Sequence, residues 1–200
     1  QSVELLDGLQ NILPANTPRF AQTNSSNLVD AYKWTELDPR TGLGLFTLYS
    51  GITDRAEPSE SLKANVAYCL GLEGPTILVS SEQVEAFRHG GVVRPETHTR
   101  GIRGAFLVNQ QLELPPGAAR SWTIVADVEQ SQADVVALSQ QLADRRKLGA
   151  DIDASVRRGS EELAGIMSRC DGFQTTAEET VTEYHYANVL FNVLRGGYFP

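Results

Sequence analysis

The stretch that decides the fold is DAYKWTELDPRTGLGLFTLYS, from Asp30 to Ser50. Its first part, DAYKWTEL (Asp30 to Leu37), alternates loosely and is rich in strand formers. Its last part, LGLFTLYS (Leu43 to Ser50), places Leu43, Leu45, Thr47 and Tyr49 on one face. Between them, DPRTG (Asp38 to Gly42) contains residues that favour turns. Two such segments joined by such a turn predict a β-hairpin.

Further strands are predicted on the carboxyl side of this hairpin, up to about Val128. The candidate segments are Leu62 to Leu72, Thr76 to Val79, Ile102 to Leu114 and Ala119 to Glu129. The last two flank LPPGAA (Leu114 to Ala119), whose Pro-Pro-Gly predicts another hairpin-like reversal. Several strands joined by turns, without helices between them, indicate an antiparallel β-sandwich.

Helical spacing of the apolar residues begins after Val128. Ser131 fits the N-cap of a helix that runs to about Lys147, and a second helix fits Ile152 to Ile166. Gly159 and Gly165 weaken the second helix or let it pack closely against another element. Earlier in the chain, SSEQVEAF (Ser80 to Phe87) fits a short helix with Ser80 or Ser81 as its N-cap.

A third helix is expected from about Thr176 to Leu194, and between Tyr186 and Leu194 it is apolar on most of its circumference. Such a helix needs other helices around it, so we expect the chain to be part of a longer protein. The predicted organisation is a β-sandwich over residues 1–129, incomplete at its amino terminus, and linker helices over 130–172. Residues 173–200 would begin a second, helical domain.

The composition limits the classes of partner. The 200 residues carry a formal net charge of −8, which argues against nucleic acid and anionic membranes. No apolar run is long enough to span a bilayer, and QSVELLDG lacks the features of a signal peptide. Cys69 and Cys170 are too far apart for a redox pair or a metal site. Two unpaired thiols fit a reducing cytoplasm, with one long-range disulfide as the alternative.

The residues alone predict no complete active site, metal site or cofactor. The three histidines, His89, His98 and His185, lack the spacing of metal ligands. We expect His98 in a surface turn and His185 in a helix core or interface. The paired carboxylates fit helix first turns, solvated helix faces and loop ion pairs. No phosphate-binding loop, dinucleotide fingerprint or GxSxG elbow is present in the sequence.

One further stretch, LLDGLQNILP (Leu5 to Pro14), has two interpretations. In the first, Asp7 and Gly8 form a turn, and the amides of Gln10 and Asn11 satisfy nearby backbone groups. In the second, one of these amides is directed at a ligand. The local chemistry favours the turn.

Three stretches together carry a resemblance. LLDGLQNILP, ITDRAEPSESL (Ile52 to Leu62) and HYANVLFNVLRGGYF (His185 to Phe199) are similar, in this order, to the amino-terminal region of glycoside hydrolase family 94. This family comprises inverting β-glucoside phosphorylases and the phosphorylase-like region of cyclic β-1,2-glucan synthases. The resemblance implies a β-sandwich, linker helices and the first helix of an (α/α)6 barrel. The family's catalytic Asp and its phosphate-binding groups would lie beyond Pro200.

The resemblance also implies an activity. Phosphate attacks a β-glucosidic bond and releases α-glucose 1-phosphate, so one protein carboxyl suffices and no cofactor is needed. The family is commonly homodimeric, and a sandwich loop of one subunit reaches the other's active site. Gln10 then becomes the leading sugar contact, with Asn11 behind it, because an amide both donates and accepts hydrogen bonds. Arg195, followed by two glycines, is a further candidate.

The resemblance leaves the substrate open. The cellobiose and chitobiose branches differ in this region, which favours cellobionic acid or 1,2-β-oligoglucan as the substrate. Two alternative functions remain. The alternatives to a phosphorylase fragment are a stand-alone carbohydrate-binding module and a transglycosylase domain of a cyclic β-1,2-glucan synthase.

Overall fold

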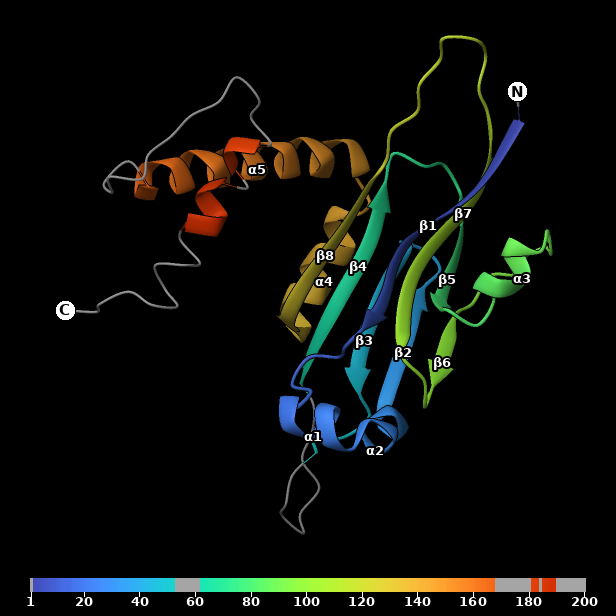
Figure 1. Cartoon of the computed structure of the whole chain (residues 1–200), viewed down its shortest axis with the longest axis vertical. Coiled ribbons are helices and arrows are strands. Elements are labelled where there is room, and N and C mark those ends of the chain that lie inside the picture. Colours follow the sequence, from blue (N-terminus) through green and yellow to red (C-terminus); the bar gives the residue numbers. More distant parts are fainter. Residues whose placement is uncertain (1, 53–61, 168–180, 184, 190–200) are drawn as a thin grey trace. The chain divides into compact units, whose positions relative to one another are not determined.

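The computed structural model describes residues 2–52, 62–167, 181–183 and 185–189 (Figure 1). The chain divides into two compact units, Gln1–Asp144 and Arg145–Pro200, which we describe separately. The division falls later than the predicted end of the sandwich at residue 129, because the helix after Ser131 contacts the strands before it.

The described part of the first unit contains two antiparallel sheets. The three-stranded sheet has the order β1-β7-β5, and the five-stranded sheet has the order β6-β2-β3-β4-β8. The strands are β1 (Ser2–Ile12), β2 (Lys33–Asp38), β3 (Leu43–Leu48), β4 (Lys63–Leu70), β5 (Thr76–Ser80), β6 (His98–Arg100), β7 (Gly104–Glu113) and β8 (Thr123–Ser131). With the helices between and after them, the protein is mainly β with α, as predicted.

Residues from both sheets share one apolar core. Phe46 of β3 and Phe106 of β7 are fully buried and belong to the same cluster. Each phenyl ring lies against a glycine of the other strand. A Cβ added at Gly104 would meet Phe46 Cδ1 at 2.6 Å, and one added at Gly44 would meet Phe106 Cδ2 at 2.9 Å. The two glycines therefore make room for the two rings.

Four helices belong to this unit as described: α1 (Arg19–Asn24), α2 (Ser26–Ala31), α3 (Val84–Arg88) and α4 (Gln132–Gln141). In Figure 1, α1 and α2 lie together at the lower end of the strands. Val84 and Phe87 of α3 pack on Leu78 and Leu107, so α3 covers the outer face of the three-stranded sheet. The α4 helix contacts β4 and β8, at one edge of the five-stranded sheet.

The predicted hairpin is confirmed. β2 pairs with β3 in a continuous register from Lys33–Leu48 to Asp38–Leu43. In the turn, the Thr41 hydroxyl donates to Asp38 Oδ2 at 2.7 Å, and the Arg40 amide donates to Oδ1 at 3.0 Å. Leu45 and Tyr49 lie on the outer face of the sheet, whereas Phe46, which points to the opposite face of β3, lies in the core.

The turn gives a testable pH dependence. The hydrogen bond from Thr41, followed by those from the Arg40 and Thr41 backbone and the Arg40 charge, lowers the pKa of Asp38 below 3.8 despite some desolvation. The carboxylate therefore stabilises the fold above pH 3.8, and this contribution is lost as the pH falls through the lower, folded-state pKa. Urea unfolding from about pH 6 to about pH 2 should show an advantage of wild type over Asp38→Asn that shrinks at low pH. A pH-independent difference would contradict this account.

Two predicted features of this unit are wrong. The LPPGAA segment does not close a hairpin, because β7 pairs with β1 and β5 whereas β8 pairs with β4 of the other sheet. The chain crosses between sheets there, and Figure 1 shows the connection extending from the upper end of the strands. The short helix after β5 exists as α3, but neither Ser80 nor Ser81 caps it: its N-cap is Gln83, without a side-chain bond.

The Ser131 cap is confirmed. Its hydroxyl accepts a hydrogen bond from the Asp134 amide, and the Asp134 carboxylate accepts one from the Ser131 amide, which completes a capping box. The helix ends earlier than predicted, at Gln141, and Lys147 belongs to the next helix, α5 (Arg145–Met167). The predicted second helix is thus confirmed as α5.

In the second unit, a Cβ added at Gly159 or Gly165 would meet no atom within 4 Å. These glycines therefore do not mark a close packing contact with the described residues. Residues 181–183 and 185–189 are helical, and Tyr186 is buried. Ser160 of α5 donates a hydrogen bond to Glu183 at 2.6 Å. Most of the predicted third helix lies outside the described residues.

Candidate functional site

The stretch LLDGLQNILP does not form the predicted turn. Residues Ser2 to Ile12 form β1, an edge strand that pairs with β7. Pairing runs as far as Gln10–Ala105 and resumes at Ile12–Gly104, so Asn11 is an extra residue at a β-bulge. Asn11 has φ 59°, in the left-handed region that asparagine tolerates better than most residues. The strand thus becomes irregular at Asn11, three residues after Gly8, and not at the turn predicted for Asp7 and Gly8.

Gly8 lets β1 approach β7 closely. Its φ is 152°, and an added Cβ would meet the Phe106 carbonyl oxygen at 2.0 Å. Only glycine fits such an approach without moving the backbone. The preceding Asp7 accepts a hydrogen bond from Trp122 Nε1 at 2.7 Å, which ties β1 to the start of β8.

The chain is also held on the far side of the bulge. Ile12 packs against the core cluster. The Asn65 amide of β4 donates to the Leu13 carbonyl at 2.7 Å and accepts from the Glu129 amide at 2.8 Å. Gln10 and Asn11 are both exposed between these anchors. Their side chains make no hydrogen bond to the described part of the chain, so the amides of Gln10 and Asn11 are available to a ligand.

The third candidate, Arg195, lies outside the described residues. The same holds for nearly all of ITDRAEPSESL and for the end of HYANVLFNVLRGGYF. The spatial relation of Arg195 to Gln10 and Asn11 therefore stays a prediction.

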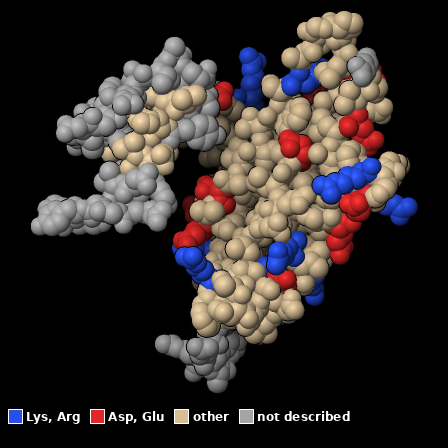
Figure 2. Space-filling model, in the orientation of Figure 1, with Lys and Arg blue, Asp and Glu red and all other residues tan. Residues whose placement is uncertain are grey.

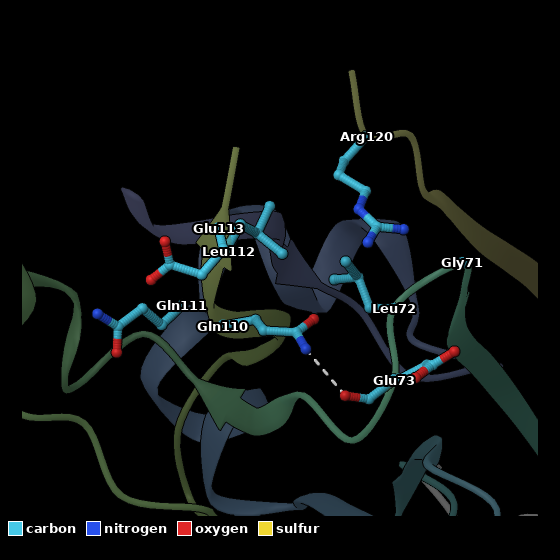
Figure 3. A pocket seen from close by; sticks show the side chains of 8 residues that line it. All are labelled: Gly71, Leu72, Glu73, Gln110, Gln111, Leu112, Glu113 and Arg120. Carbon is cyan, nitrogen blue, oxygen red and sulfur yellow. Dashed lines mark hydrogen bonds between the residues drawn. The ribbon is translucent and has the colours of Figure 1, made fainter. Parts of the chain in front are cut away.

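A polar cavity of about 210 Å³ opens elsewhere in the first unit, between the β4–β5 turn, the end of β7 and Arg120 (Figure 3). The Gln110 amide donates to the Glu73 carbonyl at 2.9 Å, and its buried Oε1 accepts no bond from the described residues. Figure 3 shows the Arg120 guanidinium pointing into this cavity, whereas Gln111 and Glu113 point away. The volume lies below the ~300 Å³ where small-molecule sites begin, so an oligosaccharide does not fit inside.

Sequence reasoning missed an aromatic cluster on the outer face of the five-stranded sheet. The Trp34 and Tyr49 rings stack with centroids 5.6 Å apart. The Arg100 guanidinium lies 3.7 Å from the Trp34 ring centroid, and the His98 ring meets Trp34 edge-on at 4.6 Å. We call these four residues the ring platform. The alternation around Trp34 was the available signal, but nothing local links it to His98 and Arg100.

His98 is therefore not in the predicted surface turn. It lies in β6, pairs with Glu36 of β2 and accepts a hydrogen bond at 3.1 Å from Arg100 Nε. The described residues contain no group of three or more His, Cys, Asp or Glu side chains arranged to hold a metal ion.

Charges of both signs share the face of the molecule that Figure 2 shows. On the face that Figure 2 shows, Lys and Arg side chains are interspersed with Asp and Glu. In the part of the chain that the structure describes, no helix has the length and apolar character needed to cross a membrane.

No family model matches the chain, and no curated protein matches its sequence.

Proposed function

We propose that this chain is the amino-terminal part of an inverting β-glucoside phosphorylase of the glycoside hydrolase family 94 type. In this proposal the two sheets form the family's β-sandwich, α4 and α5 are linker helices, and the residues from 173 onward begin the (α/α)6 barrel. The protein acts in the cytoplasm as a homodimer, with phosphate and a β-linked glucoside as substrates and without a cofactor.

The observation that carries the proposal is the bulge at Asn11. It presents two exposed amides, those of Gln10 and Asn11, at the end of an otherwise regular strand. Bulges often occur where a strand must redirect a side chain toward a functional site. Ile12 packs in the core and Gly8 packs against β7, so the backbone on both sides of the two amides is fixed.

The chemistry of the amides fits a sugar. A carboxamide donates through its nitrogen and accepts through its oxygen, so it pairs with two neighbouring hydroxyls of a pyranose. In the proposed dimer, Gln10 contacts the glucoside bound in the other subunit, with Asn11 beside it. Arg195 is a further candidate for a sugar contact, as the family resemblance implies. None of these residues transfers a proton, because the general acid belongs to the barrel.

Gln10→Ala in the intact protein should lower kcat/KM for phosphorolysis by about three- to tenfold, because one neutral hydrogen bond contributes ~0.5–1.5 kcal/mol. The measurement is the initial rate of glucose 1-phosphate release at varied glucoside concentration. Gln132→Ala is the matched control, since Gln132 is an exposed amide on α4. Unchanged kinetics for Gln10→Ala would remove Gln10 from the site.

Asn11 allows the side chain and the backbone to be tested separately. Asn11→Gly removes the amide and keeps the positive φ of 59° available, whereas Asn11→Ala strains it. If the amide contacts sugar, both variants lose kcat/KM, and only Asn11→Ala also loses stability, by about 1 kcal/mol. Full activity in Asn11→Gly would mean that Asn11 serves only to shape the bulge.

A further inference from the structure

The ring platform lies on a part of the sheet that no described helix covers. Lys33 and Thr35 are each 2% exposed, so the alternation of β2 turns the Trp34 side chain to the outer face. Arg100 and Thr47 are its direct cross-strand partners on this face. The Tyr49 amide donates to the Tyr32 carbonyl at 2.7 Å, which extends the pairing by one residue and places Tyr49 diagonally from Trp34.

The rings are held in place without a ligand. Trp34 is stacked with Tyr49 at an interplanar angle of 23°, and the Arg100 guanidinium lies over Trp34. Arg100 is fixed in turn by its hydrogen bond to His98. A preorganised surface of this kind loses little entropy when something binds to it.

The cluster is nevertheless largely open to water. Tyr49 is 75% exposed, far more than a ring that serves the core. Burying such a ring against a ligand would remove a large apolar area from water. Burying the Tyr49 ring against a ligand would therefore contribute more free energy than the ring contributes to the folded state.

We propose that the ring platform binds pyranose rings of a β-linked gluco-oligosaccharide, in addition to the contacts at Gln10 and Asn11. This inference rests on the proposed function for its substrate class. The C–H face of β-glucose carries partial positive charge and suits the negative face of Tyr49. The equatorial hydroxyls reach outward toward Glu36, Arg100 and His98, which supply acceptors and donors around the rings.

The surroundings favour a sugar over other ligands that stack on aromatic rings. A nucleic acid would bring phosphates to a chain with a net charge of −8. Tyr, Trp and Arg are also common at protein interfaces, but the centre of such an interface is depleted of charge. Here His98 and Arg100 contact the Trp34 ring, and the exposed Glu36 is the cross-strand partner of His98. A hydroxyl-rich ligand suits these neighbours.

The test is titration of the full chain, without phosphate, with a cello-oligosaccharide and with a 1,2-β-gluco-oligosaccharide. Binding is followed by tryptophan fluorescence and by calorimetry. A malto-oligosaccharide of the same length is the α-linked control. At least one β-linked ligand should bind, with about tenfold weaker affinity in Tyr49→Ala. Tyr49→Phe, which keeps the ring, should stay within about twofold of wild type.

Phe20→Ala is the matched control, because Phe20 of α1 is an aromatic residue with 80% exposure outside the platform. It should bind like wild type. Equal binding by Tyr49→Ala and wild type, or no binding by wild type, overturns the proposal. Self-association that Tyr49→Ala abolishes, without any response to sugar, also overturns it and assigns the face to a second copy of the chain.

Different experiments test the two proposals, so one can be contradicted while the other holds. Phosphate-dependent release of glucose 1-phosphate tests the proposed function, and phosphate-free sugar binding tests the platform. A protein that shows Tyr49-dependent binding but no phosphorolysis would contradict the first proposal and keep the second.

Discussion

Gly8→Ala is expected to destabilise the first unit by at least about 3 kcal/mol and to separate β1 from β7. The added Cβ would lie 2.0 Å from the Phe106 carbonyl oxygen, and a backbone atom in a central strand cannot move aside. The φ of 152° adds strain for any residue with a side chain. Urea unfolding followed by circular dichroism measures the loss. The release of β1 should also remove the hydrogen bond between Asp7 and Trp122, which changes the tryptophan fluorescence.

Gly101→Ala provides the comparison. Gly101 has φ 71°, but an added Cβ there would meet no atom within 4 Å. Gly101→Ala should therefore lower the free energy of unfolding only through the strained backbone conformation, by about 1 kcal/mol. If Gly8→Ala lowered the free energy of unfolding no more than Gly101→Ala, the close approach of β1 to β7 would be wrong. The fixed backbone that we assign to Gln10 and Asn11 would then be wrong as well.

The second large effect concerns a buried charge at the start of β2. The Lys33 side chain is 1% exposed, and its Nζ donates to Asp30 Oδ1 at 2.7 Å and to Gln22 Oε1 at 3.1 Å. Among the described residues, Asp30→Ala leaves the buried ammonium group with one neutral amide, that of Gln22, as its partner. We expect a loss of about 3–5 kcal/mol in the free energy of unfolding, measured by urea titration.

Two variants separate the charge effect from general damage. Replacing both partners, in Asp30→Ala/Lys33→Met, should recover most of the stability because no buried charge remains. Glu85→Ala breaks the exposed pair with Arg88, whose side chains are 69% and 68% exposed, and should cost less than about 1 kcal/mol. Equal losses for Asp30→Ala and Glu85→Ala would show that Lys33 is not buried as described.

The elements that the sequence predicts correctly are those that a local pattern marks, whether or not their partners in the sheet lie close in the sequence. The β2–β3 hairpin follows from alternation on both sides of a turn, and the Ser131 cap follows from a polar pair three residues apart. Both signals are complete within a few residues. The positions of β4, β5, β7 and β8 were also evident, because each is a short segment rich in strand formers.

What the sequence does not reveal depends on distant partners. Asp7-Gly8 looks locally like a turn, and it is held in a strand by pairing with β7, about a hundred residues later. The sheet that β7 joins cannot be deduced from LPPGAA, because that segment is compatible with a hairpin and with a crossing. Gly44 and Gly104 have no local signature either, since each is explained by a phenyl ring of the opposite sheet.

The candidate site likewise contains features that follow from the sequence and features that depend on distant partners. Gln10 and Asn11 were chosen for their residue types and for a family resemblance, and the structure adds their exposure and the bulge. The ring platform could not be predicted, because Trp34 and Tyr49 come from the hairpin whereas His98 and Arg100 come from the three-residue strand β6. Only the pairing of β6 with β2 brings them together.

The central claim is most directly tested by incubating the intact protein with inorganic phosphate and a panel of β-glucosides that includes cellobiose, cellobionic acid and 1,2-β-oligoglucans. We expect α-glucose 1-phosphate to form from at least one of them, and to form only when phosphate is present. Glucosyl transfer in the absence of phosphate, or no release of glucose 1-phosphate from any member of the panel, would contradict the assignment as a β-glucoside phosphorylase.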